Sequence, residues 1–358
     1  MSRQRIVIIG GGIAGLSTAW HLARLGAGEV LLVERERALA TQSTAQNAAI
    51  VRTAIDDESL RALAHRGAQF LLHPPADFAH KSPILGHGLI VFSRSPGRWS
   101  EADCERVDRA RTRELMPALP PRSDSGWFFP DEGHVDVGAV VRNFAAGATA
   151  ADVEIRLGTA VHRLLADGHG VELSDGTVIE CDHTVIAAGA WAAPLARAVG
   201  SCVDLTPTRR HLIVTRRDPR IATTWPTIWS DEDAFYARPE SGGWMLCPCD
   251  EDAVDPDRLA ASASALESTY AKARAVLGAT PLSPPARLWA GLRTHASDQR
   301  FVLGRDADVP GLVWAAGLGG HGITCAAAVG EIAAAATIGA PLAPELTEPF
   351  SPHRFRTH

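Results

Sequence analysis

The chain has 358 residues, 46% hydrophobic and 21% charged, enough for two domains or one large interleaved domain with a sizeable core. This balance excludes disordered and fibrous chains. The formal charge of −6 gives no reason to expect nucleic acid or a polybasic membrane contact. Six cysteines are not a disulfide framework. Cys247 and Cys249 have no second pair at metal-ligand spacing, so we expect no metal.

Nothing in the chain predicts a membrane segment. The N-terminus lacks the small-residue cleavage site of a signal peptide. The most apolar stretch, residues 323–340, carries Glu331 in its middle. We therefore expect a soluble, cytoplasmic protein without a transmembrane segment.

The first 50 residues predict a strand, a glycine turn, a helix and a second strand, followed by a loop. Residues 6–9 are continuously apolar, as in a strand buried on both faces. Apolar residues then recur at helical spacing over 13–25, and the second strand is expected at 30–33. Residues 38–50 are small and polar without a period, which predicts a loop in close approach to another group.

The middle of the chain predicts helices and short strands in alternation. We expect helices over 57–72, 98–113 and 137–150, and strands over 88–92, 153–156, 159–165, 170–174 and 177–180. Ser174-Asp175-Gly176 predicts a tight hairpin between the last two strands.

The second half predicts a mixed sheet enclosed by dinucleotide-type elements. Residues 184–189 form a buried strand ending in glycine, 205–250 and 286–316 are strand-rich, and helices are expected over 257–277 and 322–338. The fold class is therefore α/β, with a Rossmann-type domain interleaved with an antiparallel-sheet domain.

A dinucleotide fingerprint lies after the first strand. Gly10, Gly12 and Gly15 form G-x-G-x-x-G, which opens a helix, and Glu34 ends the next strand. Gly10 permits the tight turn, Gly12 lets the backbone approach a pyrophosphate, and Gly15 lets helix and strand pack closely. Glu34 is expected to accept bonds from both ribose hydroxyls, and its charge argues against a 2′-phosphate.

A second glycine-rich turn favours FAD over NAD. Residues 317–322 again join a strand to a helix. A second helix N-terminus would stabilise the negative charge that reduced flavin carries near N1 and O2.

These residues resemble the D-amino-acid oxidase/dehydrogenase superfamily of FAD enzymes, with the glycine oxidase fold. The chain looks most similar to bacterial D-arginine dehydrogenases. Besides the fingerprint, the matching segments are Ser43-Thr44 with Asn47-Ala48-Ala49, then 187–191, 289–293, 317–323 and 350–355.

The resemblance implies a discontinuous FAD-binding domain, residues 1–75 with 135–200 and 300–358, and a substrate-binding domain, residues 76–134 with 201–299. FAD is expected to bind without a covalent link. The expected cofactor contacts are Gly10, Gly12, Ala14, Gly15, Glu34, Arg35, Ser43, Thr44, Asn47, Ala48, Ala49, Val161, Ala188, Gly189, Trp191, Gly319, Gly320, His321, Gly322, Ile323 and Thr324.

The resemblance also implies oxidation of a carbon–nitrogen bond. Hydride passes from Cα to the flavin, and the imine hydrolyses to a 2-oxo acid and ammonia. Arg293 and Arg209 match carboxylate-binding arginines, Tyr236 matches a pocket tyrosine, and Gly320 matches a glycine whose carbonyl receives the amine. The guanidinium fork suits a carboxylate.

Two of these residues have competing interpretations. Arg209 and Arg210 are adjacent and face opposite sides of a strand, so only one can point inward, and Arg209 is favoured. His321 is expected to present its backbone N–H to the flavin. No catalytic residue is assigned, because an already deprotonated amine needs no strong base.

The side-chain pocket departs from D-arginine dehydrogenase. Ile50, Ile55 and Leu89 stand where that enzyme has polar or acidic residues, so we expect a D-amino acid with a small or apolar side chain. Alternatively, Asp56 or Asp231 supplies the acid. Either oxygen or a quinone-type carrier reoxidises the flavin. The other functions considered are a sarcosine- or proline-type secondary-amine oxidase, a 2-hydroxyacid oxidase, and a flavin-binding subunit of a larger complex.

Overall fold

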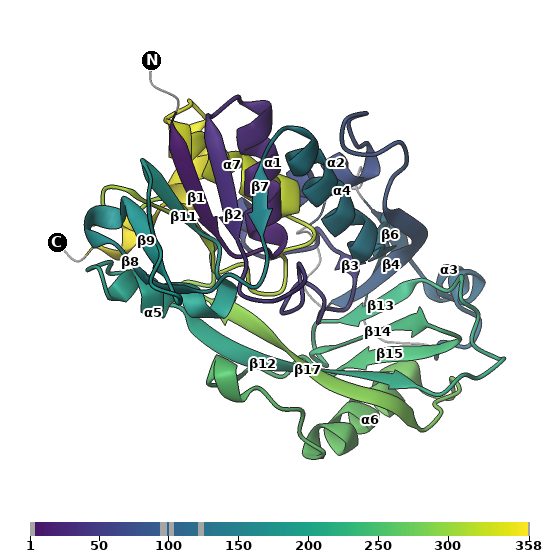
Figure 1. Ribbon diagram of the computed structural model, residues 1–358. Helices are drawn as coiled ribbons and strands as arrows, with labels where there is room; N and C mark the ends of the chain where they lie inside the picture. Colours follow the sequence, from purple (N-terminus) through teal and green to yellow (C-terminus); the bar gives the residue numbers. More distant parts are fainter. Residues whose placement is uncertain (1–3, 94–98, 100–103, 121–124, 357–358) are drawn as a thin grey trace.

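The computed structural model describes residues 4–93, 99, 104–120 and 125–356. Figure 1 shows a helix-covered sheet in the upper half of the molecule and a second sheet below it. The long strands β12 (Thr206–Thr215) and β17 (Pro285–His295) extend from beneath the upper part into the lower sheet.

The upper sheet has six strands in the order β18-β19-β11-β1-β2-β7. Their bounds are β1 Arg5–Ile9, β2 Glu29–Val33, β7 Glu154–Arg156, β11 His183–Ile186, β18 Val302–Arg305 and β19 Leu312–Ala316. Neighbours pair in parallel except β18 with β19. The continuous apolar runs follow from burial on both faces.

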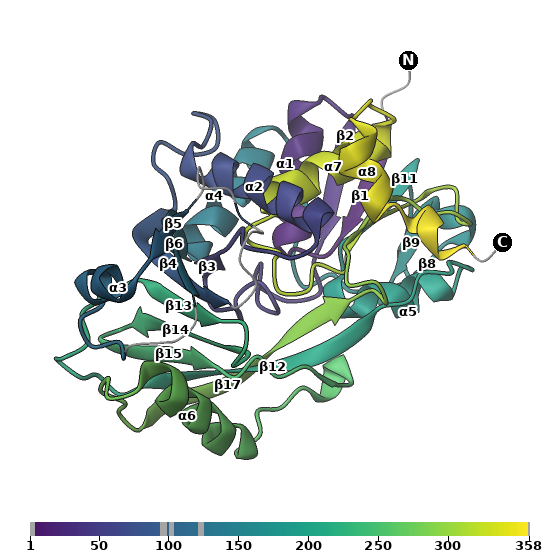
Figure 2. The same ribbon diagram turned by 180° about the vertical axis from the view of Figure 1, so that it is seen from behind.

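Both faces of this sheet are covered. Ile6 and Ile8 pack against a helical layer, whereas Val7 and Ile9 pack against a three-stranded sheet and a short helix. The helical layer, seen from behind in Figure 2, is α1 Ile13–Arg24, α2 Glu58–Leu72, α4 Val137–Ala150 and α7 Ala326–Ile338. The other layer is β8 Val161–Leu164, β9 Gly170–Leu173, β10 Val178–Glu180 and α5 Ala192–Arg197.

The lower sheet is largely antiparallel. Its order is β16-β12-β15-β14-β13-β4-β6-β3, with β17 on β12 and β5 on β6. The remaining bounds are β3 Ile50–Val51, β4 Ile84–Ser93, β5 Glu105–Val107, β6 Ser125–Val135, β13 Thr227–Ser230, β14 Phe235–Glu240, β15 Gly243–Cys247 and β16 Asp252–Ala253. Helix α6 (Ser264–Leu277) covers its outer face against Ile213, Trp244 and Leu246.

The short strand β3 links the two parts of the molecule. It follows the N-terminal loop but pairs with His134 and Gly133 of β6 in the lower sheet. The chain therefore enters the lower sheet at residue 50 and returns to the upper helical layer with α2, so it crosses between the two parts before the proposed boundary at residue 75. That boundary stays a prediction.

Three helices differ from those expected from the sequence. Of the helix expected over 98–113, residues 98 and 100–103 lie outside the described residues, 105–107 form β5, and only α3 (Arg109–Leu115) is helical, capped by Asp108. The helix expected from 257 begins at Ser264, because Asp255-Pro256 opens a separate 3-10 turn. The closing helix begins at Ala326, not at Gly322.

The fold has three further features. Strand β6 was not predicted from the sequence. Within the described ranges, every helix is too short or too polar to cross a membrane. A last short helix, α8 (Pro344–Thr347), precedes the C-terminal 3-10 turns.

Candidate active site

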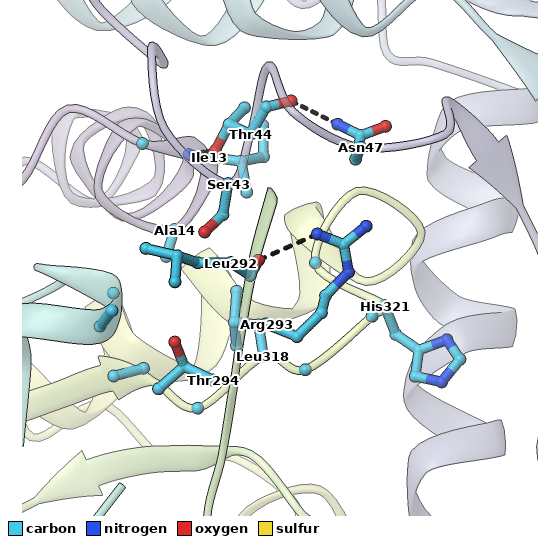
Figure 3. Close-up of a pocket in the computed structure, with 18 of the residues that line it drawn as sticks. Ile13, Ala14, Ser43, Thr44, Asn47, Leu292, Arg293, Thr294, Leu318 and His321 are labelled. Atoms are coloured by element: carbon cyan, nitrogen blue, oxygen red, sulfur yellow. Dashed lines mark hydrogen bonds between the residues drawn. The ribbon is translucent and has the colours of Figure 1, made fainter. Parts of the chain in front are cut away.

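A cavity of about 870 Å³ runs between the two parts of the molecule. Its upper wall includes the turns that follow β1, β11 and β19, and its lower wall includes β12, β14 and β17. Figure 3 shows side chains from four separate segments around it: α1, the loop with Ser43 to Asn47, β17, and the loop with Leu318 and His321. In open α/β sheets, ligands bind next to the carboxyl ends of the parallel strands. The cavity lies in that position.

The fingerprint glycines are needed for close backbone packing. Gly10 has φ +109°, and a Cβ there would lie 2.6 Å from the Ala187 carbonyl oxygen. Gly12 is the N-cap of α1, and Thr44 Oγ1 accepts a hydrogen bond from Ile13 N at 3.1 Å. Gly15 does not line the cavity. A Cβ on Gly15 would lie 2.0 Å from the Gly10 carbonyl oxygen, so α1 can pack this closely against the end of β1 only because residue 15 is glycine. The turn thus presents backbone N–H groups and the positive end of a helix.

Glu34 is fixed at one end of the cavity. Its carboxylate accepts hydrogen bonds from Gly11 N at 2.6 Å and Glu36 N at 2.9 Å. Beside it the Arg35 guanidinium lies 3.8 Å from the centre of the Trp191 ring, and Trp191 Nε1 donates to Asp257 at 2.8 Å. The lining here also includes Val161, Ala188 and Gly189.

The loop after Ser43 is held by bonds that the sequence did not predict. The Asn47 side chain bonds Thr44 O and Ala49 N, which supports Ala49 at φ +55°. Buried Arg238 donates from Nε to Ala48 O at 2.6 Å. A Cβ on Gly291 would lie 2.3 Å from Gln46 O, so the loop packs on β17 only because that residue is glycine.

The glycine-rich loop before α7 forms the opposite wall, with Gly319, Gly320, His321, Gly322, Ile323 and Thr324 all in the lining. Gly319 N donates to Thr294 O at 2.9 Å, and Thr324 Oγ1 accepts from Arg52 N at 3.2 Å. Because α7 begins only at Ala326, this loop and not the first turn of the helix faces the cavity.

His321 is electrically neutral in this setting. Burial, followed by the positive charge of Arg52, lowers the pKa of its imidazole to about 3. The ring is therefore unprotonated at physiological pH. A neutral imidazole has no readily given proton for general acid catalysis, and the expected backbone role of His321 stays a prediction.

Arg293 is a buried cation in the lining of the cavity. It is 5% exposed, and its Nη1 donates to Leu292 O at 2.9 Å (Figure 3). Burial lowers its pKa, and no carboxylate in the described part of the chain forms an ion pair with it. Gly320 is adjacent: a Cβ there would lie 4.0 Å from Arg293 Nε. A buried guanidinium without a counter-charge is a site for an anion.

Tyr236 forms the neighbouring wall. It is 3% exposed, and its ring stacks on Trp229 with centroids 4.6 Å apart. Burial raises the pKa of its hydroxyl, which therefore stays protonated and can donate a hydrogen bond.

The structure corrects the choice between the adjacent arginines. In the β12–β17 pairing, Thr208 lies opposite Arg293, so Arg210, two residues along, shares the face of Arg293. Arg210 lines the cavity, whereas Arg209 lies on the other face, pairs with Asp252 at 2.9 Å and is not in the lining. Arg209 was favoured wrongly, because the sequence alone gave no register for the strand.

Arg210 already has partners within the chain. Its Nε donates to Asp250 O at 2.7 Å, and its Nη2 bonds the Glu251 carboxylate. Arg210 and Arg293 thus differ: the first is paired with an acid and the second is not.

The remaining wall is mixed in character. Ile50 and Ile55 line the cavity, but Leu89 lies outside the lining, fully buried in a cluster with Ala54 and Phe129. Including Leu89 was wrong, because its side chain packs inside the lower sheet.

Arg52 was missed by the sequence analysis. Its guanidinium lies 4.0 Å from the Trp229 ring and pairs with Asp231 at 3.1 Å. Asp231 also accepts from Trp229 Nε1 at 2.9 Å. Asp231 and Asp56 both line the cavity, so the two acids that the sequence offered as alternatives do reach it.

This geometry is that of a dinucleotide-binding protein whose cavity continues from the glycine fingerprint to buried cationic side chains. The model of the FAD dependent oxidoreductase family matches residues 5–336, and the chain belongs to this family. The expected superfamily and the α/β fold are thereby confirmed.

Known relatives agree with this assignment. The chain is 27% identical to 4-methylaminobutanoate oxidase (formaldehyde-forming) of Paenarthrobacter nicotinovorans over 91% of its length, but it spans only 43% of that protein. It is 25% identical to glycine oxidase of Bacillus licheniformis, over 98% of each chain. The crystal structure of L-proline dehydrogenase from P. horikoshii has the same fold, with a TM-score of 0.84 at 21% identity, covering 99% of this chain and 98% of that one.

The cavity fits the cofactor of the family. Gly12, at the start of α1, lets the backbone approach a pyrophosphate, and Glu34 is placed for a ribose. The loop from Gly317 to Thr324 and the Ser43 to Ala49 loop would enclose the flavin end, next to Arg293.

Proposed function

We propose that this enzyme oxidises an α-amino acid to an imine, which hydrolyses to a 2-oxo acid and ammonia. One observation carries the proposal: Arg293 is buried in the cofactor cavity without a carboxylate partner among the described residues. A substrate carboxylate supplies the missing charge, and this anchor places the adjacent Cα in the cavity.

Each residue around Arg293 contacts a different part of the substrate or cofactor in this proposal. Bound FAD supplies the chemistry of accepting the Cα hydride. Arg293 holds the substrate carboxylate, and the Tyr236 hydroxyl adds a hydrogen bond from the neighbouring wall. The Gly320 carbonyl accepts a hydrogen bond from the amine, which orients its lone pair. His321, being neutral, adds no charge next to the amine.

The substrate side chain faces a wall that is partly apolar. Ile50 and Ile55 favour a small or apolar group, as expected for a D-amino acid with such a side chain. Fewer apolar residues support this side-chain preference than the sequence indicated. Leu89 is absent from the wall, and the ion pair of Arg52 with Asp231 is part of it. Because Asp231 is already paired with Arg52, it is not available as the counter-charge of a basic substrate side chain.

A secondary amine is the second candidate. Two relatives bear names that denote oxidation of such amines, 4-methylaminobutanoate oxidase and L-proline dehydrogenase. The same anchor would serve, because Arg293 binds the acid and not the amine.

Anaerobic reduction of the bound flavin tests the proposal. The purified holoenzyme is mixed with D-, L- and N-methyl amino acids and with 2-hydroxy acids, and bleaching of the visible flavin band is followed. We expect bleaching by D-amino acids with small or apolar side chains. Bleaching by N-methyl amino acids alone selects the second candidate. Bleaching by hydroxy acids alone, or by none of the compounds, would refute amine oxidation.

A further inference from the structure

Two arginines stand on the same face of the β12–β17 ribbon, but only one is open to a ligand. Thr208 lies opposite Arg293, and Arg210 is two residues further along β12. Diagonal neighbours on antiparallel strands are about 7–8 Å apart at Cα, within the reach of long side chains. Both guanidiniums can therefore contact one carboxylate, yet Arg210 is already bonded to Glu251.

Glu251 is held less firmly than the residue before it. The Asp250 carboxylate accepts bonds from His211 N at 2.9 Å and contacts His211 Nδ1 at 2.6 Å, which fixes the backbone here. The Glu251 carboxylate has Arg210 as its partner, and its side chain is 52% exposed. It also lines the cavity. A rotation about its side-chain bonds would move the carboxylate into solvent without disturbing Asp250.

We propose that Glu251 is an internal competitor for the carboxylate of the substrate: it holds Arg210 until a substrate carboxylate enters between Arg210 and Arg293 and displaces it. This inference rests on the proposed function. Exchange of one carboxylate for another keeps Arg210 neutralised in both states. The substrate therefore gains less from Arg210 than from Arg293.

A matched pair of variants of the holoenzyme tests the proposal. Glu251→Gln removes the competitor, whereas Asp252→Asn removes the acid that pairs with Arg209 on the opposite face, outside the cavity. The dissociation constants of acetate and propionate are measured from the shift of the flavin spectrum, together with KM for the substrate that bleaches the flavin. We expect Glu251→Gln to bind both acids at least about threefold more tightly, with a matching fall in KM and no gain in kcat. Asp252→Asn should bind as the parent does.

Three outcomes would overturn it. Equal affinity in the parent and in Glu251→Gln shows that no competition exists. Weaker binding in Glu251→Gln shows that Glu251 orients Arg210 instead. An equal gain in Asp252→Asn shows a general charge effect. In each case bleaching by amino acids still upholds the proposed function, whereas a protein that binds no carboxylate and is bleached by no amine loses both.

Discussion

Arg209 and Arg210 show how far the sequence predicts the direction of a single side chain. Alternation along a strand predicts that one of the two faces inward, but it does not say which. The pairing of β12 with β17 decides, because it places Thr208 opposite Arg293 and so brings Arg210 to the cavity face. The type of side chain was predictable from the sequence, whereas its direction depended on a register set by residues about 80 positions away.

In the proposed function, Arg293 is the residue on which substrate binding depends most. Arg293→Ala removes the buried charge that would hold the carboxylate. Loss of a charged hydrogen-bonding partner costs about 1.5–3 kcal/mol, so kcat/KM should fall roughly tenfold to a hundredfold while flavin content is retained. Arg293→Lys should recover only part of the activity, because an ammonium lacks the fork. Steady-state kinetics on flavin-loaded protein measure both.

Arg209→Ala provides the matched control. Arg209 has the same side chain on the adjoining strand but lies outside the cavity, paired with Asp252. We expect it to keep the parent kcat/KM. A similar loss in both variants would show that Arg293 acts through the stability of the sheet and not through the substrate.

Among the elements, the locally determined ones were predicted best. The strand, turn and helix at the N-terminus follow from a short apolar run, a glycine fingerprint and helical spacing, and the structure has β1, α1 and β2 there. The 257–277 segment was predicted poorly. Asp255-Pro256 is a helix-start signal, but it opens only a 3-10 turn, and α6 begins where Ala265 and Thr269 become buried against the lower sheet. Tertiary burial sets this boundary, and a local signal does not contain it.

The loop that carries Ser43 to Ala49 depends on one glycine of β17. Gly291→Ala would place a Cβ 2.3 Å from the Gln46 carbonyl oxygen. Since both groups are backbone or next to it, the loop must move, at a cost of about 1–3 kcal/mol. We expect a lower Tm and a lower ratio of flavin to protein absorbance in the purified variant. Full flavin content with an unchanged Tm would show that the loop yields freely.

For the whole molecule, the sequence revealed the family but not the composition of the cavity. The glycine-rich segments, and the segment 289–293 that ends in Arg293, are each contiguous in the sequence, so each could be recognised by itself. Arg52, Glu251 and Trp229 belong to no such motif, and only folding brings them to the same cavity. The expectation about the substrate side chain was weakest for this reason: it relied partly on Leu89, which the resemblance placed in the wall and the fold buries elsewhere.

The distribution of cysteines predicts that flavin is not covalently attached. All six cysteines are described and free, and Cys249 is the one that lines the cavity. A hydrogen bond with Cys247, together with burial, holds the pKa of the Cys249 thiol well above its usual range, so the nucleophilic thiolate is suppressed. Cys325, deep in the protein, has a raised pKa because of burial. Acid or heat denaturation should therefore release yellow flavin into the supernatant. Flavin that precipitates with the polypeptide would disprove the prediction.

Stability should fall as the solution is acidified, because three histidines in separate parts of the fold are held neutral. Burial lowers the pKa of His21 and of His134 to about 4, and that of His321 to about 3. In the unfolded chain a histidine titrates near 6.5, so between pH 6.5 and the folded pKa the unfolded state binds more protons. The free energy of unfolding is therefore not reduced by these histidines above about pH 6.5, and it falls progressively as the pH drops from there towards 4.

His21 allows this linkage to be measured away from the cavity. It lies in α1 with its ring against Trp20 at 4.8 Å, so His21→Phe keeps an aromatic contact and removes the titration. At pH 5 the buried histidine should cost about 2 kcal/mol relative to neutral pH, because pH 5 lies roughly 1.5 units below the pKa of histidine in the unfolded chain and still above the folded pKa. The fall in Tm between pH 7 and pH 5 should therefore be smaller in His21→Phe than in the parent. His162→Phe, at an exposed position of β8, should retain the parent's fall. If His21→Phe loses as much Tm on acidification as the parent, the acid sensitivity has another origin, because a phenylalanine cannot bind the proton that the unfolded histidine takes up.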